Sequence, residues 1–306
     1  MGTIMKKTGV AVVGFGNVGQ YAVKALQQAD DLQLKGIIER SDRLELGRKI
    51  LPDMLFEEEI EKIEGVDIAV LCVPSLMVPE VASRILKCGI STVDCFDIHG
   101  DEVVDLKNKL HSLSVANNVV SLSAAGWDPG LDSAMRVLFE IAAPQGMTFT
   151  NFGPGISMGH TVAAKAVPGV KNALSVTLPK GFGAHKRCVY VETDPDFDFE
   201  EIAQNIKNDK YFINNETHVV ASDAIDKITD AGNRVVIERK GTASQAANQR
   251  FTFEATLNNP AVTAQMMVSS VRAAMKQKPG NYLLIEVAPI DFLAGDDRGA
   301  LIKKFV

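Results

Sequence analysis

The amino-acid sequence predicts an α/β fold in which a doubly wound parallel sheet is followed by a second, α+β domain. Three observations predict it. A glycine-rich turn near the N-terminus joins a short apolar run to a segment with helical periodicity. Strand and helix patterns then alternate as far as about residue 125, and short strand patterns separated by Gly and Pro follow up to residue 260. Residues 261–306 add a long helix pattern and one more strand.

The glycine-rich turn indicates a binding site for a dinucleotide. The buried strand pattern Val10–Val13 runs into Gly14-Phe15-Gly16-Asn17-Val18-Gly19, where the helix pattern begins. Gly14 permits the tight turn, Gly16 lets the backbone approach a pyrophosphate, and Gly19 lets the helix pack closely on the strand. Free N–H groups at the start of the helix then bind the phosphates. We therefore predict a Rossmann-type domain for a nicotinamide dinucleotide, with a purely structural turn as the alternative.

Further strands complete the expected parallel sheet of residues 1–125. They are predicted at Leu34–Ile38, Val66–Val73, Ser91–Asp94 and Val119–Leu122, with helices from Pro79 to Gly89 and through about Leu113. Ligands of such sheets bind where the carboxyl ends of the strands emerge. The segments at these ends are Cys72-Val73-Pro74-Ser75, Asp94-Cys95-Phe96-Asp97 and Ala125-Gly126-Trp127-Asp128.

Residues 126–260 are rich in strand patterns. These lie at Thr148–Phe152, Ala173–Leu178, Arg187–Glu192, Thr217–Ala221, Val235–Glu238 and Phe251–Leu257. We expect one open mixed or antiparallel sheet that forms a second domain. The C-terminal part, with a helix at Ala261–Lys276, a strand at Tyr282–Ala288 and a terminal helix, is expected to return to the first domain.

Composition excludes several classes of function. The chain has 306 residues, of which 46% are hydrophobic, yet no run approaches the roughly 18 apolar residues of a membrane span. A net charge of −6 without a basic stripe argues against nucleic-acid binding. The four cysteines show no CxxC spacing, which favours free thiols in the cytoplasm. The five histidines lack ligand spacing, so we predict no metal site.

Polar side chains at the predicted strand ends suit an amino acid substrate. Asp97 and Asp128 can bind an ammonium group, and Trp127, the only tryptophan, lies beside Asp128 in a loop fixed by Gly and Pro. The alternatives are core packing for Trp127 and capping or turn formation for the aspartates. Farther along the chain, Arg187 offers a guanidinium that can bind a carboxylate, unless it lies on a solvated strand edge.

Several segments resemble the meso-diaminopimelate dehydrogenase family along nearly the whole chain. They are GFGNVG (14–19), TVDCFDIHGD (92–101), AGWDPG (125–130), NFGPGISMGH (151–160), HKR (185–187) and NNPAVTAQ (258–265). The resemblance implies a cytoplasmic homodimer that oxidatively deaminates the D-centre of meso-2,6-diaminopimelate to L-2-amino-6-oxopimelate and ammonia, usually with NADP. It also assigns substrate binding and dimerisation to residues 126–260. The compact second domain is similar to the branch that also converts simpler 2-oxo acids to D-amino acids.

The resemblance assigns roles to individual residues. It gives the reacting centre to Asp97, Trp127 and Asp128, the pocket wall and floor to Phe152, Met158 and Gly159, and the distant L-centre to Thr177, Arg187 and Asn259. A family histidine at that distant end is replaced by Asn233. Cofactor contacts are expected from the glycine turn (Gly14, Phe15, Gly16, Asn17, Val18, Gly19), from Glu39, Arg40 and Ser41, from Cys72, Val73, Pro74 and Ser75, from Asp94, Cys95 and Phe96, and from Pro129 and Gly130.

Three residues after the second strand bear on the choice of cofactor. Glu39 stands where an acid usually binds the ribose of NAD and repels the 2′-phosphate of NADP. Arg40 and Ser41 can bind that phosphate, although family members usually carry two basic residues here. We predict that NADP is preferred and that NAD is also used, on the expectation that Glu39 turns to solvent while Arg40 engages the phosphate.

Two other functions compete with this interpretation. A reductase of the dihydrodipicolinate or sugar type could use the same scaffold, but the Glu-Lys-Pro signature of the sugar enzymes is replaced by Cys72-Val73-Pro74-Ser75. A non-catalytic nucleotide sensor would need no polar groups near the nicotinamide, so Asp97, Trp127, Asp128 and Arg187 together argue against it.

Overall fold

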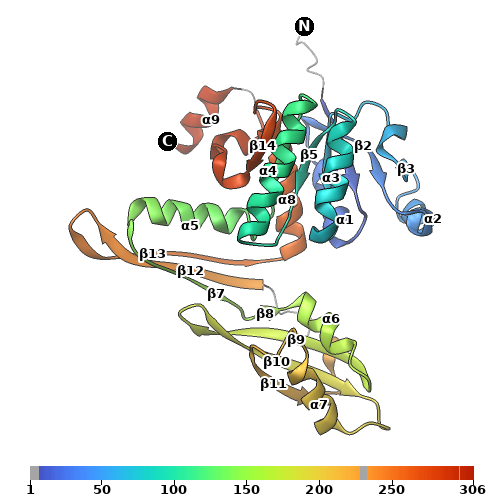
Figure 1. Cartoon of the computed structure of the whole chain (residues 1–306), viewed down its shortest axis with the longest axis vertical. Coiled ribbons are helices and arrows are strands. Elements are labelled where there is room, and N and C mark those ends of the chain that lie inside the picture. Colours follow the sequence, from blue (N-terminus) through green and yellow to red (C-terminus); the bar gives the residue numbers. More distant parts are fainter. Residues whose placement is uncertain (1–6, 228–232, 296) are drawn as a thin grey trace. The chain divides into compact units, whose positions relative to one another are not determined.

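The computed structural model of the chain describes residues 7–227, 233–295 and 297–306 (Figure 1). The chain divides into two compact units. The first comprises Met1–Ala134 and Asn259–Val306, and the second comprises Met135–Asn258. The boundaries expected after residues 125 and 260 come from sequence motifs, whereas the units of the structure are defined by contacts within each unit. The roles that the sequence assigns to those segments stay predictions. The C-terminal segment belongs to the first unit.

The first unit contains a seven-stranded sheet, in the order β14-β6-β5-β4-β1-β2-β3. Its strands are β1 (Thr8–Val13), β2 (Leu32–Ile38), β3 (Phe56–Glu57), β4 (Ile68–Leu71), β5 (Ser91–Asp94), β6 (Val120–Ser123) and β14 (Gly280–Leu283). All neighbouring strands run parallel. The order reverses between β1 and β4, and such a switch point is where doubly wound sheets bind their ligands. The predicted Rossmann-type sheet is therefore confirmed.

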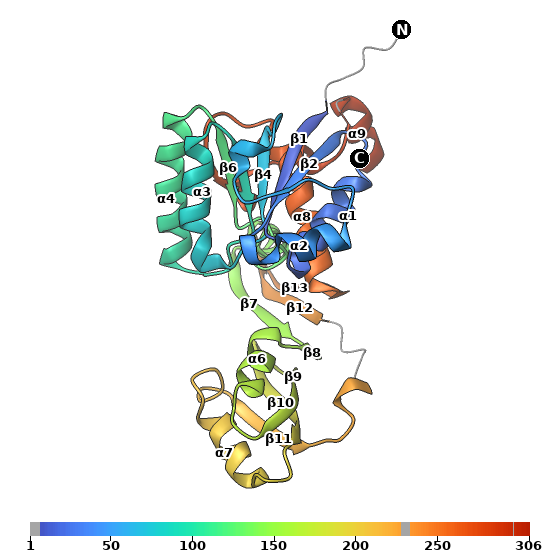
Figure 2. The ribbon, with the colours of Figure 1, turned by 90° about the vertical axis from the view of Figure 1, so that its right-hand side faces the viewer.

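Helices cover both faces of this sheet. Figure 2 shows α3 (Val78–Lys87) and α4 (Asp101–Ala116) on one side of the sheet, and α1 (Asn17–Gln27) and α8 (Asn259–Ala274) on the other. The residues of β1 alternate between the two layers, because successive side chains of a strand point to opposite faces. Val12 packs in the cluster of α1 and α8, whereas Val13 packs in the cluster of α3 and α4. Both faces are thus buried, as the continuous apolar strands predict.

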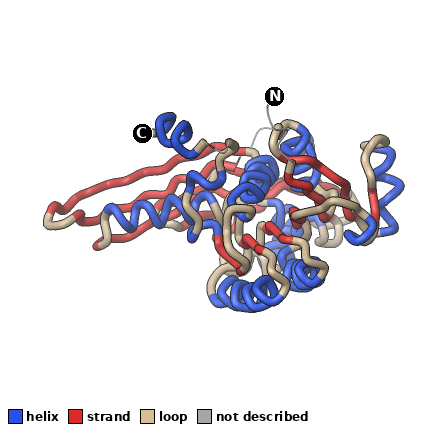
Figure 3. The backbone as a smooth tube through the Cα atoms, turned by 90° about the horizontal axis from the view of Figure 1, so that it is seen from above, coloured by secondary structure: helices blue, strands red, loops and turns tan. Residues whose placement is uncertain are grey.

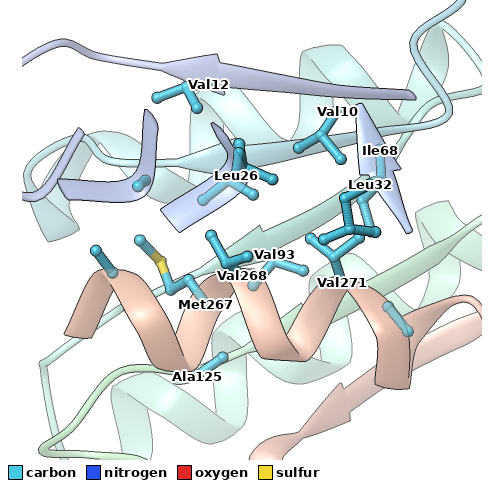
Figure 4. Packing of buried hydrophobic residues seen from close by; sticks show 14 of the residues in the cluster. Val10, Val12, Leu26, Leu32, Ile68, Val93, Ala125, Met267, Val268 and Val271 are labelled. Carbon is cyan, nitrogen blue, oxygen red and sulfur yellow. The ribbon is translucent and has the colours of Figure 1, made fainter. Parts of the chain in front are cut away.

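Helix α8 is part of the first unit's core although it comes late in the sequence. Met267, Val268 and Val271 are buried against Val10 and Leu26 (Figure 4). Full burial of one such side chain contributes about 1.5–3 kcal/mol, so these contacts attach the C-terminal segment firmly to the sheet. This unit also contains α2 (Ser41–Ile50) and α9 (Arg298–Phe305).

The second unit contains two sheets, so the expected single sheet is wrong. One has the order β11-β10-β9-β8 and the other the order β13-β12-β7. The strands are β7 (Gln145–Phe152), β8 (Gly155–Ile156), β9 (Val170–Gly181), β10 (Ala184–Thr193), β11 (Glu216–Ala221), β12 (Asn233–Ala243) and β13 (Ala246–Leu257). The chain passes from one sheet to the other at Gly153, whose φ is +102°. A Cβ there would lie 2.2 Å from the carbonyl oxygen of Thr177, so this passage requires glycine.

Three helices of the chain were not predicted from the sequence. They are α5 (Leu131–Ala142), α6 (Met158–Lys165) and α7 (Phe199–Asn208). Helix α5 runs along the three-stranded sheet (Figures 1 and 3) and is fixed there by the salt bridge between Glu140 and Arg239. The strand expected at Tyr282–Ala288 ends earlier, at Leu283, because the carboxylate of Glu286 accepts a hydrogen bond from the Leu283 N–H (2.8 Å) and starts a turn. Within the described ranges, no helix has the length and apolar character needed to cross a membrane.

Candidate active site

The glycine turn leaves open space where a ligand is expected. Gly14 has a φ of +92°, and a Cβ there would lie 2.5 Å from the Cys72 carbonyl oxygen. A Cβ on Gly19 would lie 2.0 Å from the Gly14 carbonyl oxygen, so α1 can approach β1 only with glycine there. A Cβ on Gly16 would meet no atom within 4 Å. Gly16 is thus not required by internal packing, and the open space beside it is where a dinucleotide pyrophosphate would approach the backbone.

The start of α1 offers N–H groups to an anion. Its cap residue, Gly16, provides no side-chain hydrogen bond to the first turn, where Asn17 and Val18 lie. N–H groups at such a helix start, together with the helix dipole, bind phosphate. The ring of Phe15 points inward and packs edge-on against Phe56, with 5.3 Å between ring centroids.

Glu39 does not turn to solvent as expected. Its carboxylate is buried and accepts hydrogen bonds from the backbone N–H groups of Phe15 and Arg40, both at 2.9 Å. The acid therefore fixes the glycine turn to the end of β2. Arg40 is exposed over 68% of its side chain and pairs with Asp42 at 3.3 Å, and Ser41 begins α2 in an exposed position.

Asp94 connects the carboxyl ends of β5 and β6. Its side chain is fully buried and accepts hydrogen bonds from the Phe96 N–H (3.0 Å), the Ala124 N–H (3.2 Å) and the Ser123 hydroxyl (2.8 Å). Burial raises the pKa of the Asp94 carboxyl, although these three hydrogen bonds oppose the effect. Its oxygens are engaged inside the protein, where they fix the backbone that leads to Asp97 and Trp127. The cofactor contact that the sequence assigns to Asp94 stays a prediction.

Asp97 lies at the surface, where it is joined to the end of β4. The Ser75 hydroxyl donates to the Asp97 carboxylate, and the Asp97 N–H donates back to the Ser75 oxygen at 3.1 Å. Val73 and Pro74 lead into the short turn that begins at Ser75. The sheet thus brings together two of the segments that the sequence predicts for cofactor and substrate.

Two thiols lie below this surface. Burial raises the pKa of Cys72 well above its usual value, and burial with the charges of Asp94 and Asp97 raises the pKa of Cys95 to about 12. All four cysteines are free. Across the described ranges, no cluster of three or more His, Cys, Asp or Glu side chains is suited to hold a metal ion. Neutral thiols of this kind line the loops and supply no thiolate nucleophile.

The loop after β6 has a tightly constrained backbone. Gly130 has a φ of +146°, and a Cβ there would lie 1.9 Å from the Gly126 carbonyl oxygen. Between these glycines lie Trp127, which is buried, Asp128, which is partly exposed, and Pro129. The loop is further fixed by the Asp132 N–H, which donates to the Trp127 carbonyl (3.1 Å). Asp128 follows Trp127 in this constrained loop after β6, and Asp97 follows the neighbouring strand, β5.

In the second unit, Arg187 and Thr177 form a direct pair. They are opposite each other on β10 and β9, and the Arg187 guanidinium donates to the Thr177 hydroxyl. Burial lowers the pKa of Arg187. Among the described residues, its Nε has no hydrogen-bond partner although it is buried. A partly buried guanidinium with an unused N–H is well suited to bind a carboxylate.

The other predicted substrate residues are distributed over both units. In the second unit, Phe152 ends β7, Gly159 lies in the first turn of α6, and Asn233 begins β12. The side chain of Met158, which begins α6, lies outside what the structure describes. Asn259 belongs to the first unit, where it begins α8 and accepts a hydrogen bond from the Thr263 hydroxyl at 3.1 Å.

Sequence reasoning missed two parts of this arrangement. His185 and His160 both lie near Arg187, whose charge, after burial, lowers the pKa of each imidazole. The sequence HKR (185–187) could have indicated His185, because residues two apart on a strand share a face and His185 therefore lies on the same face as Arg187. The second missed part is Asn281 of β14. Its side-chain amide donates hydrogen bonds to the hydroxyls of Ser121 (3.0 Å) and Ser123 (2.9 Å), and so connects β14 to the hydrogen bonds around Asp94. No local pattern marks this residue, because the contact joins distant segments.

Comparisons with known proteins match both parts of the chain. A family described as "Diaminopimelic acid dehydrogenase C-terminal domain" matches residues 126–183, and one described as "CoA binding domain" matches residues 5–99. The meso-diaminopimelate D-dehydrogenase of Bacteroides fragilis is 48% identical over 292 residues, covering 95% of this chain and 97% of the relative.

Solved structures are similar over nearly the whole chain. C. glutamicum DAP dehydrogenase in complex with DAP gives a TM-score of 0.84 at 26% identity, covering 99% of this chain and 100% of that chain. An engineered D-amino acid dehydrogenase bound to NADP⁺ gives a TM-score of 0.78 at 26% identity, with 98% and 100% covered.

Proposed function

The chain belongs to the meso-diaminopimelate D-dehydrogenase family, and we propose that it oxidises the D-centre of meso-2,6-diaminopimelate. The C–H and N–H bonds of that centre are converted to an imine, and water then releases ammonia and L-2-amino-6-oxopimelate. Bound NADP supplies the hydride acceptor. In reverse, the same site aminates the 2-oxo acid, and simpler 2-oxo acids give D-amino acids.

The observation that carries this proposal is the Arg187–Thr177 pair. The substrate has a carboxylate and an amino group at each end, so the end that does not react needs its own binding groups. A guanidinium positioned by Thr177, with a buried Nε left for a ligand, provides a carboxylate anchor. We assign Asn233 and Asn259 to neutral hydrogen bonds at this end, and Phe152, Met158 and Gly159 to the apolar wall and floor.

At the reacting end, we assign orientation of the amine to Asp97 and Asp128 and packing to Trp127. Asp97 is exposed and fixed by Ser75, so its carboxylate is available to an ammonium group. The amine must lose a proton before hydride leaves, and either carboxylate can orient the amine and the attacking water. The deamination should therefore be fastest at alkaline pH.

The cofactor assignment follows the loops at the switch point. We assign the pyrophosphate to Gly14–Gly19, the adenosine side to Glu39, Arg40 and Ser41, and the nicotinamide side to the strand ends Cys72–Ser75, Cys95–Phe96 and Pro129–Gly130. The open space at Gly16 and the uncapped start of α1 support the fit. We propose that NADP is preferred over NAD, because Arg40 is exposed and can pair with a 2′-phosphate.

The direct experiment measures the appearance of NADPH absorbance when meso-diaminopimelate is added with NADP⁺. Arg187→Ala should cost about 2–4 kcal/mol of substrate binding, because it leaves a carboxylate unpaired. Lys186→Ala, which changes the opposite face of the same strand, is the matched control and should leave the rate unchanged. A change below threefold in apparent substrate affinity for Arg187→Ala would show that the guanidinium is not the anchor.

The competing functions predict different outcomes of this experiment. A dihydrodipicolinate- or sugar-type reductase would form no NADPH from diaminopimelate, and a nucleotide sensor would bind cofactor without turnover. The 48% identity to a meso-diaminopimelate D-dehydrogenase over 95% of the chain favours neither alternative.

We also propose that the protein is a homodimer in the cytoplasm and that α5 contributes to the interface. Arg136 and Phe139 of α5 face the three-stranded sheet, through a hydrogen bond to Thr150 (3.2 Å) and a ring contact with Phe251. The opposite side of the helix exposes apolar residues, including Ile141, which is 71% exposed. Such a face suits a second copy of the chain. Ile141→Glu should shift the sedimentation coefficient to that of a monomer; an unchanged value would exclude α5 from the interface.

A further inference from the structure

His185 shares a strand face with the proposed carboxylate anchor. It lies two residues before Arg187 on β10, so both side chains point to the same face of the sheet and Lys186 points to the other. Burial and the charge of Arg187 lower the pKa of His185, which places the guanidinium within electrostatic reach of the imidazole. His185 therefore belongs to the cluster of Arg187 and Thr177.

The imidazole of His185 has a hydrogen-bond contact with the backbone of Gly183, but one of its ring nitrogens is left without a partner among the described residues. Its Nδ1 is buried, and no described residue provides a hydrogen-bond partner for it. The ring also lies edge-on to Phe152, the proposed pocket wall, with 6.3 Å between ring centroids. A buried polar atom without a partner is destabilising, so its retention beside the proposed pocket wall indicates a ligand that satisfies it.

His160 gives an internal comparison. Burial and Arg187 lower its pKa as well. Its Nδ1, however, lies 2.8 Å from the hydroxyl of Ser157, and its ring packs edge-on against Phe212 with 5.0 Å between centroids. The polar atom of His160 is thus satisfied by its own unit, whereas that of His185 is not.

We propose that His185 is a specificity-determining residue for the end of the substrate that is not oxidised. Its Nδ1 accepts a hydrogen bond from the amino group of the L-centre, while Arg187 binds the carboxylate of the same centre. This inference rests on the proposed function. A neutral imidazole suits the role, because an imidazolium beside Arg187 would repel the ammonium group. A site built around a hydrogen bond discriminates against compounds that lack the bonded group.

The test compares meso-diaminopimelate with D-2-aminopimelate. The second compound has the same chain length and both carboxylates but lacks the distant amino group. Each is measured as a substrate, and D-2-aminopimelate also as a competitive inhibitor of diaminopimelate oxidation. In His185→Leu, kcat/KM for meso-diaminopimelate should fall roughly 10- to 100-fold. For D-2-aminopimelate, kcat/KM and the inhibition constant should each change less than threefold.

Two further variants complete the design. His185→Asn, which keeps an acceptor, should lose less of the discrimination than His185→Leu, and it decides the question if His185→Leu does not fold. Lys186→Gln should leave kcat/KM unchanged for both compounds. Equal losses for both compounds, or no loss for either, would overturn the inference, because the imidazole would then serve the strand alone. A wild-type protein that neither oxidises nor binds meso-diaminopimelate would overturn the proposed function instead.

Discussion

At Glu39, both carboxylate oxygens accept backbone hydrogen bonds, one from the glycine turn and one from the start of α2. Hydrogen bonds to a charged group contribute about 1.5–3 kcal/mol each, so turning this side chain to solvent would be costly. The acid is therefore a fixed negative charge beside the glycine turn. Arg40, by contrast, pairs with Asp42 in an exposed position, and pairs of that kind are weak.

These two residues lead to a prediction on cofactor choice. A fixed carboxylate near a 2′-phosphate should cost about as much as a phosphate–guanidinium pair contributes, about 1–3 kcal/mol. We expect NADP to be preferred, but by less than a hundredfold in kcat/KM. Glu39→Arg should raise the ratio of kcat/KM for NADP to that for NAD at least fivefold. Glu45→Gln, an exposed acid on α2, controls for general charge. A wild-type preference for NAD would mean that Glu39, not Arg40, determines the cofactor.

At the scale of elements, Asp94 connects two strand ends on which the proposed chemistry depends. Its carboxylate fixes the backbone at Phe96 and Ala124, which precede the loops of Asp97 and Trp127. Asp94→Asn replaces one acceptor with a donor inside a buried network, so it should lower the free energy of unfolding by about 1–3 kcal/mol. It should also lower kcat more than it raises KM for NADP, because it displaces the loops. Steady-state kinetics and urea unfolding of one preparation measure both. An equal loss in cofactor affinity would mean that Asp94 contacts the cofactor.

A second prediction at this scale concerns α8. Its residue Arg272 donates two hydrogen bonds, of 2.7 and 2.8 Å, to the carboxylate of Asp31. The bond to Arg272 lowers the pKa of Asp31 below 3.8. A lowered pKa means that the pair stabilises the fold above the unfolded pKa and that this contribution is lost as pH falls through the folded pKa. Asp31 is 39% exposed, so solvent screening limits the contribution to about 0.5–1 kcal/mol.

Asp31→Asn should therefore lower the urea midpoint at neutral pH and converge with wild type as the pH falls below 3.8. Asp30→Asn, at the exposed neighbouring position, controls for the loss of one negative charge. A difference that persists unchanged to low pH would show that the aspartate acts through packing rather than through its charge.

Five strands of the first sheet were predictable because each carries its own signal, a mostly apolar run before a turn or helix. The short edge strand β3 was not predicted, and β14 was expected with other bounds, because only pairing with distant segments defines them. The division of the second unit into two sheets was not, because β7 pairs with β12, which lies some 80 residues later in the chain. Helix α6 also escapes prediction, since MGHTVAAK lacks a clear apolar stripe. Helix α7 had a usable signal: Asp198 caps it by accepting from the Glu201 N–H at 3.0 Å.

The residues of the candidate site also differ in how far the sequence could predict their contacts. The glycine turn could be predicted because its chemistry is local. The Arg187–Thr177 pair depends on the register of β9 and β10. Nε of Arg187 and Nδ1 of His185 are buried without described partners, and their burial depends on the packing around them. Sequence could name Arg187 as a candidate carboxylate anchor, but it could not show which residues surround its guanidinium.

At the scale of the whole molecule, the proposed binding groups are divided between the two units. Asp97, Trp127 and Asp128, assigned to the end that reacts, belong to the first unit. Of the groups assigned to the other end, Thr177 and Arg187 belong to the second unit, whereas Asn259 belongs to the first. Each end of diaminopimelate carries the same two functional groups, so charge alone cannot distinguish them. Only the configuration of each centre differs, so under this assignment an anchored L-centre leaves the D-centre as the end that is oxidised.

This division predicts stereochemical selectivity. meso-Diaminopimelate has one L-centre to bind and one D-centre to react, whereas the L,L isomer presents the wrong face of its reacting centre when its other end is anchored. Hydride loss from the L,L isomer should therefore be slower by at least roughly a hundredfold in kcat/KM, the scale at which misplaced reacting atoms lower rates. The measurement is NADPH formation from each isomer, with the isomers first separated by chiral chromatography. Arg187→Ala should reduce the selectivity, because without the anchor either end can bind in either sense. Comparable turnover of both isomers by the wild-type protein would contradict the assignment of the two ends to separate groups.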